Sequence, residues 1–175
     1  MFLAQALSAT STVEVWDCDP QGSATEWYFR SQENSESLPF SVETVNIAKL
    51  KRATTAAEYV VIDTGPADAR GIDPALSIRQ VAVLPTAPSG MDLERLYETE
   101  AVAARACPAY ALLTLVDRRT SSAETGLNAL ARQNIGHFET VIPMLTRIRH
   151  AYGHGLSELF GYEKIAFELK EAMQW

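Results

Sequence analysis

The sequence has few cysteines, no long apolar run and no excess of positive charge. Cys18 and Cys107 lie far apart and match no metal-ligand spacing, so we expect two reduced, buried thiols in a cytosolic protein. No apolar run approaches the ~20 residues that cross a bilayer, so we expect no membrane partner and a cytoplasmic location. The net charge of −7 argues against a protein whose whole surface binds nucleic acid, but it leaves a local basic patch open.

Two common enzyme signatures are also missing. There is no GxSxG sequence, which argues against a hydrolase with a serine on a strand-to-helix elbow. No GxGxxG follows a predicted strand, which argues against a Rossmann dinucleotide site. The 175 residues contain no low-complexity tract and are enough for one domain with a substantial core.

Strand and helix patterns alternate along the chain, which predicts an α/β fold: a mostly parallel sheet with helices on both faces. Continuous apolar runs at 59–64 and 81–86 are typical of strands buried on both faces. Ser23 and Glu26 have the capping-box spacing, which predicts that this serine caps the second helix. The predicted strands cover residues 13–17, 40–45, 59–64, 81–86, 110–116 and 138–143, and the predicted helices cover 2–9, 23–32, 47–57, 91–107, 122–134 and 161–175.

Acidic side chains follow several of the predicted strands, at the edge of a parallel sheet where ligands bind. Asp17 and Asp19 follow the first strand, Asp63 ends the run "YVVID", and Asp117 follows "YALLTLV". A carboxylate after an apolar strand can hold a magnesium-bound water, and a second one can orient or deprotonate an attacking water. The alternative for each acid by itself is that it caps a turn, since aspartate is a common turn residue.

The stretches that carry these acids resemble the ParA/MinD family of deviant Walker ATPases, in particular its ParA-type partition proteins. "WDCDPQGSATEW" resembles the family's "DxDPQ" segment, and "EYVVIDTGPAD" resembles its Walker B segment. "VAVLPTAPSGMDLERL", "LLTLVDRRTSSAETGLNAL" and "ETVIPMLTRIRHAYGHGLSELF" resemble later segments in the same order. The resemblance covers essentially the whole chain and implies a single ParA-like domain over residues 1–175 with a P-loop NTPase-like core.

The resemblance also implies roles for individual residues. Asp19 would be the catalytic residue that positions the attacking water, and Asp63 would hold Mg²⁺ through a water. Asp17 matches the first acid of "DxD", and Gln21 to Thr25 match a segment that responds to the nucleotide. The residues expected to contact the cofactor are Asp17, Gln21, Thr25, Pro85, Asp117 and Arg118.

The family's phosphate-binding loop has no counterpart in these residues. The family opens with a strand and a "KGGxGKTT" loop, whereas Met1 aligns inside the helix that follows, and no GxxxxGK[ST] occurs anywhere. MgATP is therefore the cofactor expected of a full-length family member, and this chain is expected to bind none, because backbone N–H groups and a lysine must hold the phosphates. Two explanations remain open: a truncated ATPase, or a degenerate homologue that acts as a non-catalytic dimerisation or partner-binding module. The family's first strand is also central in its sheet, so we expect unpaired backbone groups on the neighbouring strands.

The densest basic cluster is "RIRHAYGH", residues 147–154. Arg147 and Arg149 are candidates for non-specific contacts with DNA phosphates, and a solvated helix face is the alternative. The family resemblance further implies a homodimer, a ParB-like or other centromere-binding partner protein, and a role in plasmid or chromosome segregation.

Overall fold

The computed structural model describes residues 1–46, 50, 52–65 and 80–174. They divide into two compact units: Met1–Ile78 with Arg147–Ala166, and Arg79–Thr146 with Phe167–Trp175. We call these unit 1 and unit 2 and describe each by itself. The single domain over residues 1–175 stays a prediction.

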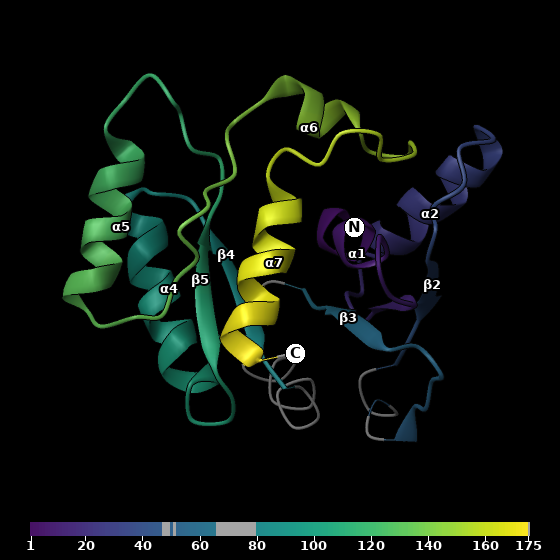
Figure 1. Cartoon of the computed structure of the whole chain (residues 1–175), viewed down its shortest axis with the longest axis horizontal. Helices are drawn as coiled ribbons and strands as arrows, with labels where there is room; N and C mark the ends of the chain where they lie inside the picture. The colour runs from purple at the N-terminus through teal and green to yellow at the C-terminus, as the bar shows by residue number, and fades with distance from the viewer. Residues whose placement is uncertain (47–49, 51, 66–79, 175) are drawn as a thin grey trace. The chain divides into compact units, whose positions relative to one another are not determined.

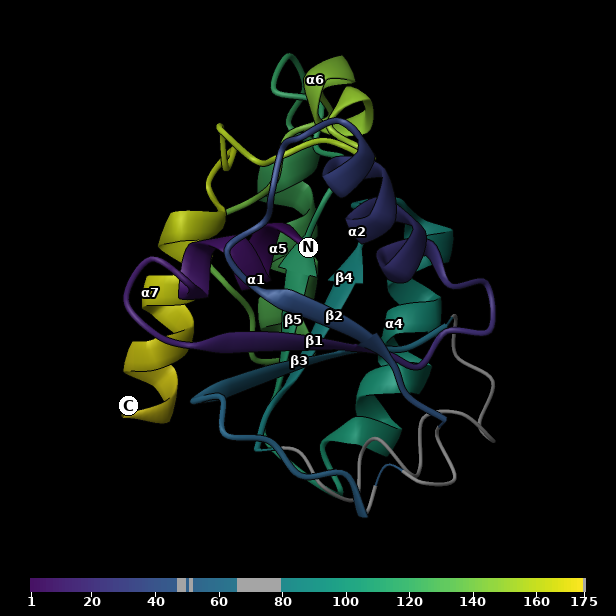
Figure 2. The ribbon, with the colours of Figure 1, turned by 90° about the vertical axis from the view of Figure 1, so that its right-hand side faces the viewer.

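Unit 1 contains a parallel sheet in the order β2-β1-β3, with β1 in the middle (Figure 2). Its strands are β1 (Val13–Asp17), β2 (Ser41–Thr44) and β3 (Tyr59–Asp63). Its helices are α1 (Phe2–Leu7), α2 (Ser23–Glu33) and the first part of α7 (Tyr162–Met173), and α6 (Thr146–His150) lies at its boundary (Figure 1).

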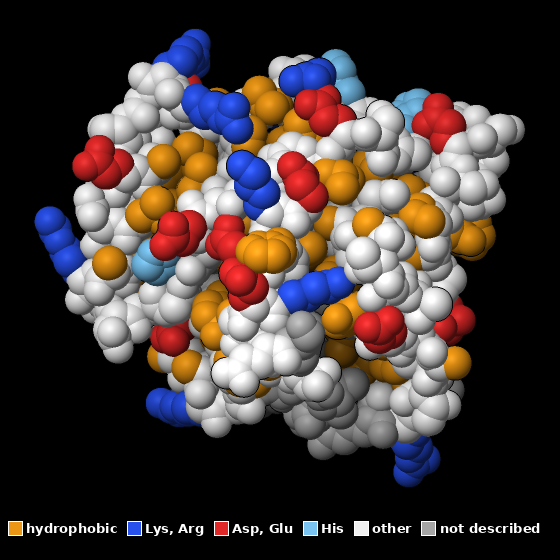
Figure 3. All heavy atoms as spheres, in the orientation of Figure 1, with side chains coloured by type: hydrophobic (Ala, Val, Ile, Leu, Met, Phe, Trp, Pro, Cys, Tyr) orange, Lys and Arg blue, Asp and Glu red, His pale blue; other side chains and the backbone are white. Residues whose placement is uncertain are grey.

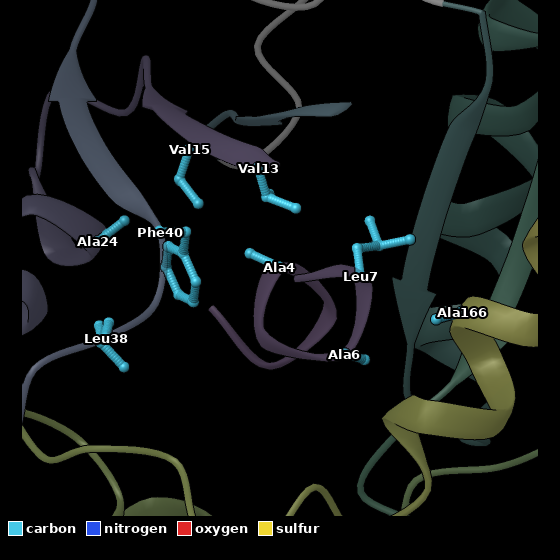
Figure 4. Close-up of a cluster of buried hydrophobic side chains, with 9 residues drawn as sticks. All are labelled: Ala4, Ala6, Leu7, Val13, Val15, Ala24, Leu38, Phe40 and Ala166. Carbon is cyan, nitrogen blue, oxygen red and sulfur yellow. The ribbon is translucent and has the colours of Figure 1, made fainter. Parts of the chain in front are cut away.

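Strand β1 is covered on both faces because its side chains alternate between two apolar clusters. Val13 and Val15 point toward α1 and pack with Ala4, Leu7 and Phe40 (Figure 4). Trp16 points the other way and packs with Leu50. The alternation continues to Asp17, which shares the face of Val13 and Val15 but is itself polar and fully buried. The apolar core along β1 therefore ends at a buried carboxylate.

Unit 2 contains a two-stranded parallel sheet, β4 (Ala82–Thr86) and β5 (Ala109–Leu113), which run side by side in Figure 1. Helices α4 (Gly90–Ala103) and α5 (Ser122–Arg132) pack on it. Leu93, Leu96 and Leu130 from these helices join Ala111 and Leu113 of β5 in one buried cluster. All strand pairings among the described residues are parallel, which confirms the predicted α/β class.

Strands β3 and β4 are less buried than predicted. Every residue of β3 is partly exposed, and Pro85 of β4 is exposed. Among the described strands, β3 pairs only with β1 and β4 only with β5. The prediction of complete burial was wrong because each strand has one described neighbour rather than two. Pro85 is compatible with such a position, since proline has no N–H to give to a second neighbour.

Two further predicted elements differ from the structure. Residues 47–49 and 51 of the predicted helix 47–57 lie outside the described residues, and residues 53–57 are not helical. There the Thr55 hydroxyl accepts the backbone N–H of Ala57 at 2.9 Å, a local bond that competes with helix formation. The predicted strand 138–143 is reduced to two isolated bridges, at His137 and Pro143.

The reason for the lost strand is visible in its hydrogen bonds. The backbone N–H groups of Glu139 and Thr140 donate to the Glu168 carboxylate, at 2.8 and 3.1 Å, instead of to a neighbouring strand. Pro143 has no N–H to donate at all. The segment therefore touches β5 at both ends and departs from it in between.

Candidate functional site

The carboxyl ends of β1 and β3 bring Asp17, Asp19 and Asp63 together. Asp17 and Asp63 are direct partners in the register of the two strands, so their side chains share one face. The backbone N–H of Cys18 donates to the Asp63 carbonyl oxygen at 2.8 Å, which extends the pairing one residue beyond β1. The loop that carries Asp19 therefore begins at Cys18, whose backbone is hydrogen-bonded to β3.

Asp17 is wholly buried and organises the loop and the start of α2. Its Oδ2 accepts hydrogen bonds from the Thr25 backbone N–H at 2.8 Å and from Thr25 Oγ1 at 2.6 Å. Its Oδ1 accepts the backbone N–H of Asp19 at 3.2 Å. Three donors thus satisfy a side chain that would be costly to bury unpaired. The structure shows Asp17 holding α2 to β1, and its contact with a nucleotide stays a prediction.

This arrangement replaces the predicted cap of α2. The N-cap is Gly22, in the left-handed conformation with φ of +65°, and no side chain of the helix start caps it. The Ser23–Glu26 capping box was therefore wrong. The carboxylate of Asp17 takes over the role from a different element, by accepting an N–H of the first helical turn that has no partner within the helix.

Asp19 is half-buried and has an oxygen left for a ligand. Its Oδ1 accepts the backbone N–H of Gln21 at 2.9 Å, and among the described residues no hydrogen bond to its Oδ2 is present. Gly65 lies against it: a Cβ at that position would be 3.0 Å from Asp19 Oδ1. A larger residue at position 65 would displace the Asp19 side chain.

Two residues of this site were not predicted. Gly65 is one, because its closeness to Asp19 depends on how the loops after β1 and β3 meet. Thr44 is the other: its hydroxyl is 3.1 Å from Thr25 Oγ1 and ties the end of β2 to the same network. Its position near the end of the predicted strand 40–45 was the available signal, but a lone threonine there is too common to single out.

The electrostatics of the site are dominated by burial and by clustered acids. Burial raises the pKa of Asp63, the amino group of Met1 opposes the rise, and the negative charges of Asp17 and Asp19 add to it. Burial also raises the pKa of the Cys18 thiol, and Asp17 and Asp63 add to that. Cys18 is only half-buried, unlike Cys107, so the expectation of two buried thiols holds for Cys107 alone.

The cluster is a region where a cation would be stabilised. Carboxylate oxygens are the ligands that Mg²⁺ prefers, and a positive charge would relieve the repulsion that helps to raise the Asp63 pKa. The described residues contain no group of three or more His, Cys, Asp or Glu side chains placed to hold a metal ion directly. The role expected of Asp63, a single carboxylate that holds Mg²⁺ through a water, stays a prediction.

The remaining predicted cofactor residues lie in unit 2. Pro85 is in β4, while Asp117 and Arg118 follow β5. The Asp117 carboxylate is held by Arg119, with Oδ1 accepting from the backbone N–H and Nε at 3.0 Å each and Oδ2 from Nη2 at 2.9 Å. These hydrogen bonds lower the pKa of Asp117 to about 2. Arg118 is exposed beside this pair.

The basic cluster lies in and after α6 of unit 1. Arg147 pairs with Glu158 and lies over the Phe160 ring, 5.4 Å from its centroid. Arg149 and His150 are exposed. On the face drawn in Figure 3, the described Lys and Arg side chains are interspersed with Asp and Glu and form no continuous basic surface.

Comparison with known proteins identifies the fold and the family. No family model matches the chain. A putative plasmid partition protein of Borrelia burgdorferi, bound to AMPPNP, superposes with a TM-score of 0.74 at 15% identity, over 98% of this chain and 91% of that one. MinD of Aquifex aeolicus, in a complex with MinC, gives a TM-score of 0.71 at 10% identity, over 99% and 87% of the chains.

One relative shows which family the chain belongs to. Maintenance of carboxysome distribution protein A of Gloeobacter kilaueensis, a ParA-like protein, is 34% identical over an alignment of 164 residues that covers 90% of this chain and 74% of that protein. The chain belongs to the ParA/MinD family. Its α/β architecture is accordingly the P-loop NTPase-like ParA/MinD fold. The family includes Mg-nucleotide binders, such as MinD of Pyrococcus horikoshii in complex with Mg-ADP, with a TM-score of 0.67 at 16% identity over 98% and 88% of the chains.

The described part of the chain contains no helix that is both long enough and apolar enough to cross a membrane.

Proposed function

We propose that the chain carries the hydrolytic half of a MgATP site in a ParA-type ATPase that segregates DNA or positions another cellular cargo. The observation that carries the proposal is the carboxylate cluster at the paired ends of β1 and β3. The 34% identical relative is named for the distribution of carboxysomes, and the structural relatives include plasmid partition proteins. These relatives support a role in positioning a cellular cargo. Which cargo this chain positions has to be determined by experiment.

In this proposal, each acid has a separate task. Asp19 orients the attacking water through its Oδ2, while Gln21 holds the other oxygen through its backbone N–H. Asp63 holds Mg²⁺ through a water, and Mg²⁺ would neutralise charge on the phosphates. Asp17 and Thr25 keep the loop and α2 in register with β1. Pro85, Asp117 and Arg118 are kept as candidates for the base, on the family resemblance alone.

We further propose that these 175 residues by themselves do not bind MgATP. They contain no GxxxxGK[ST] sequence, so they lack the glycine-rich backbone and the lysine that hold the β- and γ-phosphates. Phosphoryl transfer depends mainly on positioning and on charge stabilisation, so losing those groups removes catalysis rather than slowing it slightly. Asp19 is then a catalytic residue that is idle in this chain.

Isothermal titration calorimetry tests this proposal. The 175-residue protein, titrated with MgATP to millimolar concentration, is expected to give no saturable heat. The Asp63→Asn variant is the matched control and is expected to give the same trace. Saturable binding with micromolar affinity, lost in Asp63→Asn, would refute the idea that the missing loop is required, while confirming the role of the carboxylates.

For the full-length form, the proposal also includes MgATP-dependent homodimerisation, non-specific DNA binding through the basic cluster and recognition by a ParB-like or other partner protein. The second candidate function is a non-catalytic dimerisation or partner-binding module, which the missing phosphate loop favours. Sedimentation velocity separates the two. A dimer formed without nucleotide supports the module, whereas a monomer at all concentrations supports an idle ATPase subunit.

A further inference from the structure

The solvent side of helix α4 in unit 2 carries four exposed side chains at a symmetric spacing. Successive members are four, three and four residues apart, a spacing that places them on one face of a helix. The two outer members are apolar, and the two inner members have opposite charges. We call these four residues the α4 seam: Met91, Arg95, Glu98 and Val102.

The α4 seam lies opposite the side of the helix that packs into the core of unit 2. Leu93, Leu96 and Ala103 are the buried residues of α4, and the two leucines belong to the cluster that includes β5. With 3.6 residues per turn, these positions fall on one side of the helix and the α4 seam falls on the other. A partner can therefore cover the seam without disturbing the core.

The ends of the α4 seam expose apolar surface to water. Met91 is 67% exposed and Val102 is 42% exposed, at the first and last turns of the same helix. Single exposed apolar residues are common on protein surfaces, so neither side chain by itself indicates an interface. The argument depends on how the two apolar ends are placed relative to the charges between them.

The two charges of the α4 seam are not neutralised within the helix. Arg95 Nη1 is 3.9 Å from Asp92 Oδ1, which is longer than a hydrogen bond, and Asp92 Oδ2 already accepts the Ser89 hydroxyl at the helix cap. Glu98 is exposed and, within the part of the chain that the structure describes, takes part in no ion pair. Both charges are therefore available to groups on another molecule.

The spacing of the α4 seam reads the same in both directions along the helix. Two copies of α4 laid face to face and antiparallel would place Met91 opposite Val102 of the other copy. The same arrangement would place Arg95 opposite Glu98 of the other copy, and each contact would form twice, as a two-fold axis requires. A parallel arrangement would place each charge opposite its like, which is unfavourable.

We propose that the α4 seam pairs with the same surface of a second copy of this chain, antiparallel and without nucleotide. The apolar ends are removed from water, and the two central ion pairs fix the register and the orientation of the helices. The inference rests on the second candidate function, the dimerisation module, and supplies its surface. One helix pair is small beside the about 1,200–2,000 Å² of a stable interface, so we expect a weak, reversible dimer.

Sedimentation velocity of the 175-residue protein without nucleotide, from micromolar to millimolar concentration, tests the pairing. Arg95→Glu and Glu98→Arg each place like charges opposite one another at both central contacts. Each variant by itself is expected to weaken the dimer by about tenfold or more. An equimolar mixture of the two variants is expected to associate nearly as well as the wild type, because each variant then offers the charges that the other lacks.

Matched substitutions on α5 control for net charge. Arg132→Glu and Glu124→Arg are exposed changes of the same size in unit 2, and both are expected to leave association unchanged. The chain has a net charge of −7, so a pure net-charge effect would make Glu98→Arg associate more strongly than the wild type. The α4 seam predicts the opposite sign for this variant.

A substitution at one apolar end tests the rest of the α4 seam. Met91→Gln keeps the length of the side chain and removes most of its apolar character. Because the contact forms twice, this variant is expected to weaken the dimer by about threefold to tenfold. Met91→Leu keeps an apolar side chain and is expected to stay within about twofold of the wild type.

The possible outcomes separate the surface from the function. A wild-type dimer that persists in both single charge variants would overturn the α4 seam and leave the dimerisation module on another surface. A mixture of the two variants that associates no better than either alone would overturn the opposition of Arg95 and Glu98. A wild-type chain that stays monomeric at millimolar concentration would overturn the seam and the second candidate function together, and the idle ATPase subunit would stand.

Discussion

The Thr25 hydroxyl is the most informative group to remove from the carboxylate cluster. Thr25→Val keeps the shape of the side chain and its backbone N–H, and it deletes only Oγ1. Two interactions are lost: the 2.6 Å hydrogen bond to Asp17 Oδ2 and the 3.1 Å contact with Thr44 Oγ1. Asp17 is 0% exposed, so no water can replace the lost donor without a local rearrangement.

The magnitude follows from the environment of Asp17. A hydrogen bond to a charged group contributes about 1.5–3 kcal/mol, and an unsatisfied buried acceptor costs a similar amount. The backbone N–H of Thr25 still donates to the same oxygen, so part of the solvation of the carboxylate remains. We expect the free energy of unfolding of unit 1 to fall by about 2 kcal/mol in Thr25→Val, which corresponds to roughly 8–16 °C in Tm for a unit of this size.

Thr25→Ser is the matched control, because it removes a methyl group and retains the hydroxyl. Urea unfolding followed by tryptophan fluorescence reports mainly on unit 1, which contains Trp16 and Trp27, two of the three tryptophans of the chain. Thr25→Ser is expected to lose less than about 1 kcal/mol. A double-mutant cycle with Asp17→Asn measures the coupling directly.

One result would contradict the role of Thr25. If Thr25→Val and Thr25→Ser unfold within about 0.5 kcal/mol of each other, the hydroxyl does not stabilise the buried carboxylate. Faster amide exchange at Thr25 in Thr25→Val alone would support the attachment of α2 to β1 even if global stability changed little.

Two further predictions concern the titration of the acids. Because burial raises the Asp63 pKa above its unfolded value, the ionised form opposes folding at neutral pH; this effect grows as pH rises from about 3.8 through the folded pKa. Asp63→Asn is therefore expected to raise the free energy of unfolding at pH 7. In denaturation measured across pH, this gain in stability is expected to vanish below about pH 4. A gain that persists below about pH 4 would show that the ionised Asp63 carboxylate is not its cause. For Asp117, NMR should show a carboxyl pKa of about 2 that rises toward 3.8 in Arg119→Ala but stays below it, because the backbone N–H of residue 119 still donates to Oδ1; an unchanged pKa in that variant would rule out the Arg119 side chain as its cause.

Much of the fold was predictable because apolar periodicity is a local property. The runs "VEVWD" and "YALLTLV" form β1 and most of β5, and "MDLERLYETEAVAARAC" forms α4, which ends at Ala103. The strand predicted at 138–143 failed because a side chain from elsewhere in the chain accepts its backbone N–H groups. Glu168 accepts the N–H groups of Glu139 and Thr140 from 29 and 28 residues away, and no pattern within 138–143 indicates it.

The candidate site shows the same limit. The strand-end rule correctly brought Asp17, Asp19 and Asp63 to one edge, because parallel strands carry their carboxyl ends together. It could not distinguish Asp17, whose two oxygens accept from Thr25 and from the backbone N–H of Asp19, from Asp19, which has an oxygen left for water. That distinction depends on where α2 begins, and Gly22 and Asp17 set that point together.

By itself, the sequence determined the α/β class, the order of strand ends and the chemistry placed on each, since these depend on local pattern and spacing. It also determined the absence of a GxxxxGK[ST] loop from these 175 residues. The tertiary structure alone decided that Asp17 supports α2, that Glu158 balances Arg147, and that Glu36 holds Gly155 from 119 residues away. The physical reason is that burial and charge pairing depend on contacts between segments distant in the chain, which no local window contains.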